Sequence, residues 1–165
     1  MTSNIWFTAD PHFDHKAILR HTDRQHHFAD LDEMNDAFVD IYNHYVKPND
    51  LLIIAGDVFW RRAGHFRQRL NVRNIWVTQG NHDSSSLRKH VSRMELMIFL
   101  KTAPKIHISH YPLASWRWRE YGSIHLHGHC HGRLPVEERR IDVGMDAVFD
   151  RTGEYRPMHF DEVTS

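Results

Sequence analysis

Five short segments of this chain, each built around isoleucine, end in residues that can bind a metal ion or move a proton. Short apolar runs bounded by turn-forming residues predict buried strands. The five segments are residues 4–8, 51–55, 74–78, 105–109 and 123–127. The polar residues that follow them, in the same order, are Asp10 and His12; Asp57; Asn81 and His82; His110; His129 and His131. This recurrence constrains the fold strongly, because it links the order of the strands to the assembly of one site.

The side chains after these strands are the kind that gather around metal ions. In open α/β sheets, sites form beyond the carboxyl ends of the strands, on loops that the strands hold rigidly. The five strand ends would bring together two carboxylates, one carboxamide and up to five of the 16 histidines. That set exceeds the four ligands of a tetrahedral metal site. It suits two metal ions that share a carboxylate.

Two pairs of these residues are separated by a single position. In extended backbone, side chains two positions apart face the same way, so Asp10 with His12 and His129 with His131 would each reach one cavity. Pro11 stiffens the first of these turns. The spacing therefore predicts that both members of each pair act at the same site.

Helix signals separate the early strands. Asp30 followed by Glu33 is typical of a capping box, and apolar residues recur at helical spacing from Leu31 to Tyr45. A hairpin is expected around Pro104. Further segments with helix or strand patterns are residues 61–70, 84–91, 95–102, 139–143 and 155–160. Since early strands alternate with helices and later ones form hairpins, we expect a mixed α/β sandwich, in one domain spanning residues 1–165.

Composition excludes several classes of function. Lys plus Arg and Asp plus Glu both total 21, so the formal net charge is zero. A neutral chain is not expected to bind long nucleic acid or an anionic membrane through charge. The sequence has a single cysteine, no apolar run of ~20 residues and no basic, apolar leader at its start. We therefore expect a cytoplasmic protein with a small-molecule partner, whose oligomeric state the sequence does not indicate.

Each motif taken alone has an ordinary structural explanation. Asp57 lies in a common turn sequence, Asp83 has the position of a helix N-cap, and a single His110 would more often be structural. Cys130 is expected to point away from the site as a small packed side chain. The motifs together are more specific, because their order and their placement after strands agree.

In order, these motifs resemble those of the calcineurin-like metallophosphoesterases, over a stretch from about Phe7 to His131. The matching motifs are Asp10-x-His12, Gly56-Asp57, Gly80-Asn81-His82-Asp83, His110 and Gly128-His129-x-His131. The small bacterial-type members have a similar length, and residues 141–160 resemble their closing strands. The resemblance implies a four-layer α/β/β/α sandwich with a site for two metal ions.

The resemblance also implies roles for individual residues. The implied ligands are Asp10, His12 and His131 for the first metal, Asn81, His110 and His129 for the second, and Asp57 as the bridge. His82 would assist the leaving group or the transition state, and Asp83 would help to orient His82. Because no ligand position is missing, the sequence favours an enzyme.

The implied activity is hydrolysis of a phosphate ester by a hydroxide bound to a dinuclear metal centre. Imidazole, carboxylate and amide ligands suit Mn, Fe, Zn, Co or Ni, and Mn comes first because the family is often active with it. A small phosphodiester or nucleotide is expected rather than long DNA, since the chain is short and neutral. Two other interpretations are a nuclease on the same fold and a metal-binding scaffold that acts by protein contact.

Three segments near the motifs have no assigned role. His15 would contact substrate or cap the next helix. Residues 24–28 lie where similar small members carry an Arg-Pro-Phe-like stretch, but the proline is absent. Trp116–Arg119 is an aromatic and basic cluster. It is expected to pack its tryptophans and solvate its arginines, rather than form a wall for a base or a phosphate.

Overall fold

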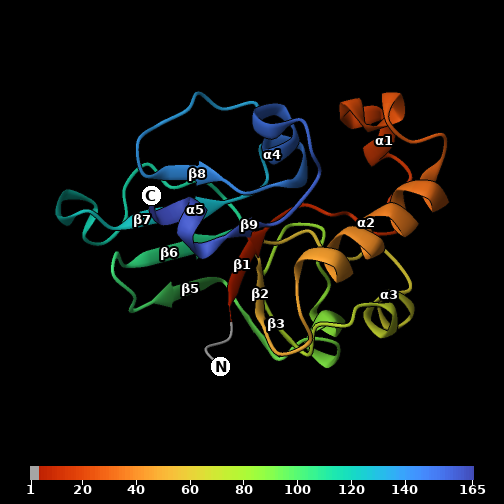
Figure 1. Ribbon diagram of the computed structural model, residues 1–165, viewed down its shortest axis with the longest axis horizontal. Coiled ribbons are helices and arrows are strands. Elements are labelled where there is room, and N and C mark those ends of the chain that lie inside the picture. The colour runs from red at the N-terminus through yellow and green to blue at the C-terminus, as the bar shows by residue number, and fades with distance from the viewer. Residues whose placement is uncertain (1–3) are drawn as a thin grey trace.

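Two β-sheets face each other in the structure, a computed structural model that describes residues 4–165 (Figure 1). The first sheet consists, in spatial order, of β4 (Arg93–Glu95), β3 (Asn74–Thr78), β2 (Leu51–Ile54), β1 (Ile5–Thr8) and β9 (Met158–His159). The second consists of β5 (Met97–Leu100), β6 (Ile106–Ser109), β7 (Ile124–His127) and β8 (Arg140–Asp142). Strands β1 to β4 are parallel, as are β6 to β8, whereas β9 and β5 run antiparallel to their neighbours. The carboxyl ends of the parallel strands in each sheet therefore share one edge.

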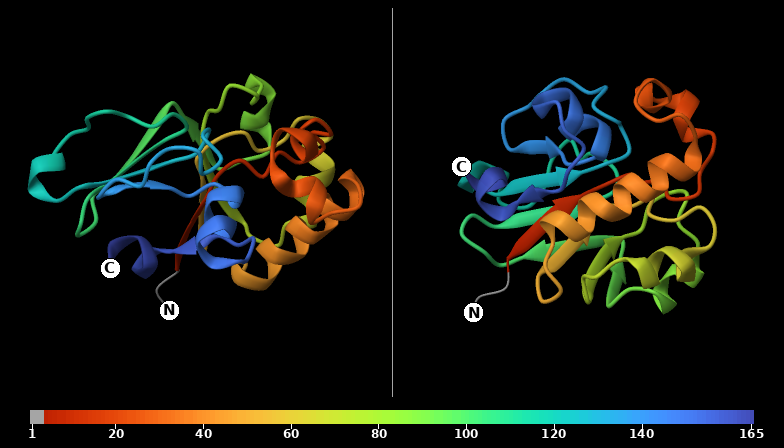
Figure 2. Two further views of the ribbon diagram at one scale, coloured as in Figure 1. Left: turned by 90° about the horizontal axis from the view of Figure 1, so that it is seen from above. Right: turned by 45° about the vertical axis from the view of Figure 1, so that its right-hand side comes forward.

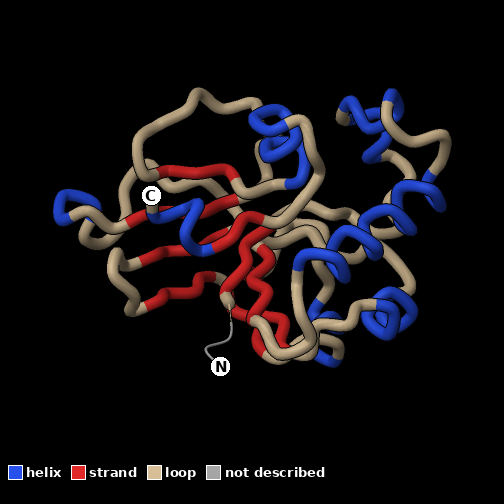
Figure 3. Tube along the Cα trace, in the orientation of Figure 1, coloured by secondary structure: helices blue, strands red, loops and turns tan. Residues whose placement is uncertain are grey.

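Helices flank the sheets (Figure 3). The α-helices are α1 (Ile18–His21), α2 (Leu31–Tyr45), α3 (Ala63–Arg69), α4 (Met145–Thr152) and α5 (Phe160–Thr164). The 3₁₀ helices are η1 (Asp23–His26), η2 (Ser85–Lys89) and η3 (Arg119–Tyr121). Helices α2 and α3 lie on the side of the first sheet that faces away from the second (Figure 2). Among the described residues, no helix combines the length and apolar character needed to cross a bilayer.

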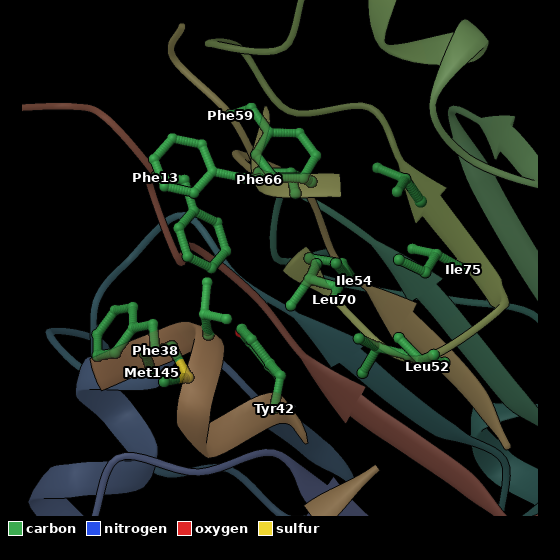
Figure 4. Close-up of a cluster of buried hydrophobic side chains, with 14 of the residues drawn as sticks. Phe13, Phe38, Tyr42, Leu52, Ile54, Phe59, Phe66, Leu70, Ile75 and Met145 are labelled. Atoms are coloured by element: carbon green, nitrogen blue, oxygen red, sulfur yellow. The ribbon is translucent and has the colours of Figure 1, made fainter. Parts of the chain in front are cut away.

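The first sheet is buried on both faces. Ile54 points with Phe38 and Phe66 into a core beneath α2 and α3 (Figure 4). Its neighbour Ile53 belongs to the core between the two sheets, where it meets Ile108 of the second sheet. A strand covered on both faces is apolar at successive positions rather than at alternate ones. This burial explains the continuous apolar run at residues 51–55.

Helix α2 begins as its sequence predicts, with one difference. The Asp30 side chain accepts a hydrogen bond from the Glu33 amide at 2.9 Å, which makes Asp30 the N-cap. The Glu33 carboxylate reaches past Asp30 and accepts from the Ala29 amide at 2.5 Å. The expected reciprocal bond of a capping box is thus displaced by one residue.

The outer face of the second sheet is covered by a thin layer, residues 111–122 with η3. Trp116 is buried, and its indole N–H donates to the Ser123 carbonyl at 3.1 Å. Trp118 packs on Phe99, with ring centroids 5.3 Å apart, while Arg117 is exposed. The cluster at 116–119 therefore packs its tryptophans, as expected. The mixed α/β sandwich with two sheets flanked by helices is confirmed.

The strand expected over residues 95–102 is shorter in the structure, where β5 covers Met97–Leu100 and Glu95 belongs to β4. The chain here contributes to both sheets: β4 pairs in parallel with β3, and β5 pairs antiparallel with β6. Leu96 lies at the crossing between the sheets and is exposed. The predicted hairpin around Pro104, formed by β5 and β6, is confirmed.

Candidate metal centre

Loops that leave the carboxyl ends of β1, β2, β3, β6 and β7 carry the predicted metal ligands. The structure brings all seven together: Asp10, His12, Asp57, Asn81, His110, His129 and His131. Five of them line a cavity of about 220 Å³. Asp10 and His110 lie beneath this cavity, with exposures of 0% and 1%. The site therefore has a buried floor and an open mouth.

Left-handed backbone positions five of these residues. Asp10, His12, Asp57, His129 and His131 have positive φ angles between 49° and 69°. The extended backbone expected for the two closely spaced pairs is therefore wrong, because alternating left-handed residues turn both side chains of each pair inward. Such conformations cost roughly 1–3 kcal/mol each and persist where the surrounding structure imposes them, most often at functional sites.

Two glycines make room for this arrangement. A Cβ at Gly80 would overlap the Asp57 carboxylate, and a Cβ at Gly56 would overlap the His110 ring. Gly56 also has a φ of +88°, which side chains disfavour. These positions let the backbone of one loop pass directly against the functional side chain of another.

The first ligand group joins Asp10, His12 and His131, whose ligand atoms lie within 4.8 Å of one another. Asp10 Oδ1 and His12 Nε2 are buried and have no hydrogen-bond partner among the described residues. Leaving a buried polar atom unpaired costs about 1–3 kcal/mol, and more when it is charged. A cation held by this group would contact both atoms. The residues present therefore fit a divalent metal ion.

The second group joins Asp10, Asp57 and His110, again with ligand atoms within 4.8 Å of one another. The Nδ1–H of His110 donates to the Ala55 carbonyl at 2.8 Å, so Nε2 carries the lone pair. That nitrogen lies 2.9 Å from Oδ1 of Asn81 and 3.4 Å from Oδ2 of Asp57. Acceptors that face one another repel unless a cation lies between them. This donor set also fits a metal ion.

Asp57 lies between the two sets of histidines. Its Oδ2 atom is 3.6 Å from His12 Nε2 and 3.4 Å from His110 Nε2. His129 joins the second set through Nδ1, which lies 3.1 Å from Oδ1 of Asn81. The position of this carboxylate is compatible with the bridging role that the sequence analysis assigns to it.

The electrostatics of the floor favour a bound cation. Burial, and then the carboxylates of Asp142 and Asp57, raise the pKa of Asp10 well above its ordinary value. Burial, and then the positive charge of Arg24, lower the pKa of His12 well below its ordinary value. His12 is thus neutral near pH 7, as a ligand must be. A cation beside Asp10 would offset the repulsion among these carboxylates.

A buried ion pair holds the first ligand group from behind. The Nδ1–H of His131 donates to Oδ2 of Asp146 at 2.7 Å. The guanidinium of Arg24, fully buried, donates to both oxygens of Asp146 at 2.8 and 2.7 Å. Arg24 also donates to the carbonyl oxygens of Asp10 at 2.7 Å and Pro11 at 3.0 Å. The pair therefore orients the His131 ring and fixes the Asp10 loop.

The charge of Asp146 is stabilised by this pair. Although burial acts to raise the pKa of Asp146, the Arg24 charge and the His131 hydrogen bond lower it well below its ordinary value. The resulting stability is present above the pKa of an unfolded aspartate and is lost as the pH falls towards the lowered pKa. The sequence analysis placed Arg24 in a segment without an assigned role and missed Asp146, because no local pattern distinguishes it from a surface residue.

Replacing Asp146 by asparagine is expected to weaken Mn²⁺ binding by roughly 10- to 100-fold. The carboxamide keeps the size of the side chain but removes the charge that polarises His131 and opposes buried Arg24. Titration calorimetry with Mn²⁺ measures the change. Asp40→Asn, on the exposed face of α2, is the matched control and should bind as the unmodified protein does. Equal affinities for the two variants would rule out this role for Asp146.

The structure places His82 at the cavity and Asp83 behind it. The His82 ring is exposed, with its centroid 5.5 Å from that of His12. Asp83 is buried, and its carboxylate accepts from the backbone amides of Asp57, Val58 and Gly80 at 2.8–2.9 Å. Among the described residues, Asp83 makes no hydrogen bond to the His82 ring, so it positions His82 through the backbone of its loop and not through a contact with the ring. Asp83 instead ties the Asp57 loop to the Gly80 loop.

His15 and Trp60 form one wall of the site. The His15 ring stacks on Trp60 with centroids 4.2 Å apart and an angle of 7°. Its Nδ1 lies 3.0 Å from Nδ1 of His12, so one ring donates to the other. The Trp60 ring is 5.2 Å from that of His82. His15 thus contacts the candidate ligand His12 rather than capping a helix, and the sequence analysis did not single out Trp60.

Comparisons with known proteins agree with this geometry. The family model described as calcineurin-like phosphoesterase matches residues 3–153. The Gene 66 protein of Mycobacterium phage D29 is 26% identical and covers 90% of both chains. An uncharacterized protein of Methanocaldococcus jannaschii is 24% identical and covers 95% of this chain and 87% of its own. The crystal structure of a protein of unknown function from Aquifex aeolicus superposes with a TM-score of 0.73 at 18% identity, covering 98% of both chains.

Proposed function

This chain belongs to the calcineurin-like phosphoesterase family, and we propose that it hydrolyses a small phosphodiester or nucleotide with two divalent metal ions. One observation carries the proposal: within residues 4–165, the buried atoms Asp10 Oδ1 and His12 Nε2 have no hydrogen-bond partner, and a cation would contact both. The zero net charge supports a small substrate over long DNA. Because Cys130, the single cysteine, has no disulfide partner, we also propose a reducing compartment such as the cytoplasm.

In the proposed assignment, the two ions are held by two sets of side chains with one shared carboxylate. The sets are Asp10, His12 and His131 for one ion, Asn81, His110 and His129 for the other, and Asp57 between them. These mixed nitrogen and oxygen ligands suit Mn foremost, and also Fe, Zn, Co or Ni. Such ions stabilise charge on phosphoryl oxygens and lower the pKa of water, which supplies a nucleophile near neutral pH.

The side chains of this chain supply the remaining chemistry. His82 lies exposed at the cavity, where its imidazole would donate a proton to the oxygen of the leaving group or a hydrogen bond to the phosphoryl group. The three amide bonds to Asp83 hold the Asp57 and Gly80 loops together, which keeps His82 beside the cavity. The Trp60–His15 stack shields one flank of the site from water.

Titration with Mn²⁺ is expected to reach two ions per chain, since two ligand groups converge here. Because Asp10 must be ionised to bind a cation and its pKa is raised well above the ordinary value, affinity should fall as the pH drops towards that raised pKa. The lowered pKa of His12 keeps this imidazole neutral over the same range. Calorimetry at several pH values measures both quantities. A panel of phosphomonoesters, phosphodiesters and cyclic nucleotides, assayed with each metal, tests the activity. Active protein with no bound metal would contradict the proposal.

A further inference from the structure

A second cavity adjoins the metal centre. Its volume is about 390 Å³, within the ~300–1,000 Å³ range of small-molecule sites. It shares His21 and His131 with the smaller cavity over the ligand groups. A molecule with its phosphate at the metal centre would therefore reach into this second space past His131.

Two carboxylates without partners line the second cavity. Asp23 comes from η1 and Asp150 from α4, so they belong to different walls. Among the described residues, neither makes an ion pair or a side-chain hydrogen bond. Burial, and then the charges of Asp146 and Asp23, raise the pKa of Asp150. These carboxylates are available to hydroxyl or amide donors, and the side chains of Arg20 and Arg133 line the same cavity.

An aromatic surface completes the lining. Phe149 and Tyr155 stack with centroids 4.4 Å apart and an angle of 23°. His27 packs on Phe149 with centroids 4.5 Å apart. All three residues line the cavity. A ligand that fits here has a flat apolar part and a part that donates hydrogen bonds.

We propose that this cavity binds the nucleoside part of a phosphate ester whose phosphate lies at the metal centre. The sugar hydroxyl would donate to Asp23 or Asp150, and the base would pack against Phe149 and Tyr155. This proposal rests on the proposed function for the position of the phosphate.

Two substrates with one leaving group test the proposal: thymidine 5′-(p-nitrophenyl phosphate) and methyl p-nitrophenyl phosphate. The unmodified protein should prefer the nucleoside ester by at least about 10-fold in kcat/KM. Asp150→Ala should reduce this preference by about 10-fold, the scale of one hydrogen bond to a charged group, and leave the methyl ester unaffected. Asp40→Ala is the control for loss of a carboxylate outside the cavity and should keep the preference.

Equilibrium binding separates failure of this proposal from failure of the proposed function. Calorimetry with Mn²⁺-loaded protein should find thymidine 5′-monophosphate bound more tightly than methyl phosphate, with Asp150→Ala removing the difference. If neither chromogenic ester is hydrolysed, the proposed function fails. The binding measurement still shows whether the cavity binds the nucleoside. Equal binding of the two phosphates would overturn the proposal. The proposal would also be overturned if Tyr111→Ala, at a ring beside His129, lost the preference for the nucleoside phosphate while Asp150→Ala kept it.

Discussion

Asp57→Asn is expected to lose both metal ions and to lower kcat/KM by roughly 10³-fold or more. The carboxylate lies between His12 and His110, at 3.6 and 3.4 Å from their Nε2 atoms. Two cations that share this position need its negative charge, which a carboxamide does not supply. Several kcal/mol of transition-state stabilisation depend on the ions, and each 1.36 kcal/mol is tenfold in rate.

Asp57→Asn removes the charge of the side chain but keeps its shape, so it tests the role of the charge in a protein that still folds. Oδ1 of Asp57 accepts from the His82 amide at 2.9 Å, and the oxygen of an asparagine can accept the same bond. The variant should therefore fold with a melting temperature close to that of the unmodified protein. His12→Ala, which removes a ligand of one ion only, is the comparison and should lose less metal and less activity. Full metal content and full activity in Asp57→Asn would disprove the bridging role.

His82→Ala is expected to bind two metal ions nearly normally and to lose roughly 10²–10⁴ in kcat, the scale of a positioned acid–base group. Its ring stands exposed at the cavity, with centroids 5.5 Å from His12 and 5.2 Å from His15. The His82 amide, which binds Asp57, is retained in the variant. His82→Ala should therefore keep its affinity for metal ions and lose catalytic rate.

The leaving group distinguishes two roles for His82. Nitrophenolate barely needs a proton, so the loss should be smaller for nitrophenyl esters than for alkyl esters if His82 acts as an acid. An equal loss for both classes would favour stabilisation of phosphoryl charge. Loss of a metal ion in the variant would make His82 a ligand, and unchanged rates with every substrate would make it structural.

The course of the strands and the candidate residues at their ends were predictable from local pattern. β3 has the predicted bounds of residues 74–78, and β1, β2, β6 and β7 differ from prediction by one terminal residue. Burial on both faces imposes apolar runs on β1, β2 and β3, whereas β6 and β7 alternate Ile or Leu with His or Ser, and both patterns are legible in the sequence. A polar residue directly after a buried strand is likewise a local signal. For these reasons the eight candidate residues at the strand ends could be identified together before their geometry was known, whereas the division into seven ligands and His82 rested on the family resemblance.

The backbone conformation at the ligands was not predictable in this way. Extended backbone and alternating left-handed backbone both turn residues two apart to one side, so spacing alone does not distinguish them. Asp10 and His12 adopt the left-handed form, with φ of 55° and 51°. Hydrogen bonds from their amides to the carbonyls of Gly56 and Asp57, on the neighbouring strand's loop, impose it. Tertiary contacts decided this feature.

The groups that support the ligands also depend on the tertiary structure. Arg24 and Asp146 are 122 positions apart, yet they form the ion pair behind His131. Asp83 has the sequence position of a helix N-cap, but it binds the amides of the Asp57 loop, 25 and 26 positions away. Local periodicity reports which residues are buried and which end a strand. The partner of a buried charge is decided only when the sheets and helices pack. That choice depends on distances in space, which the separation of two residues in the sequence does not encode.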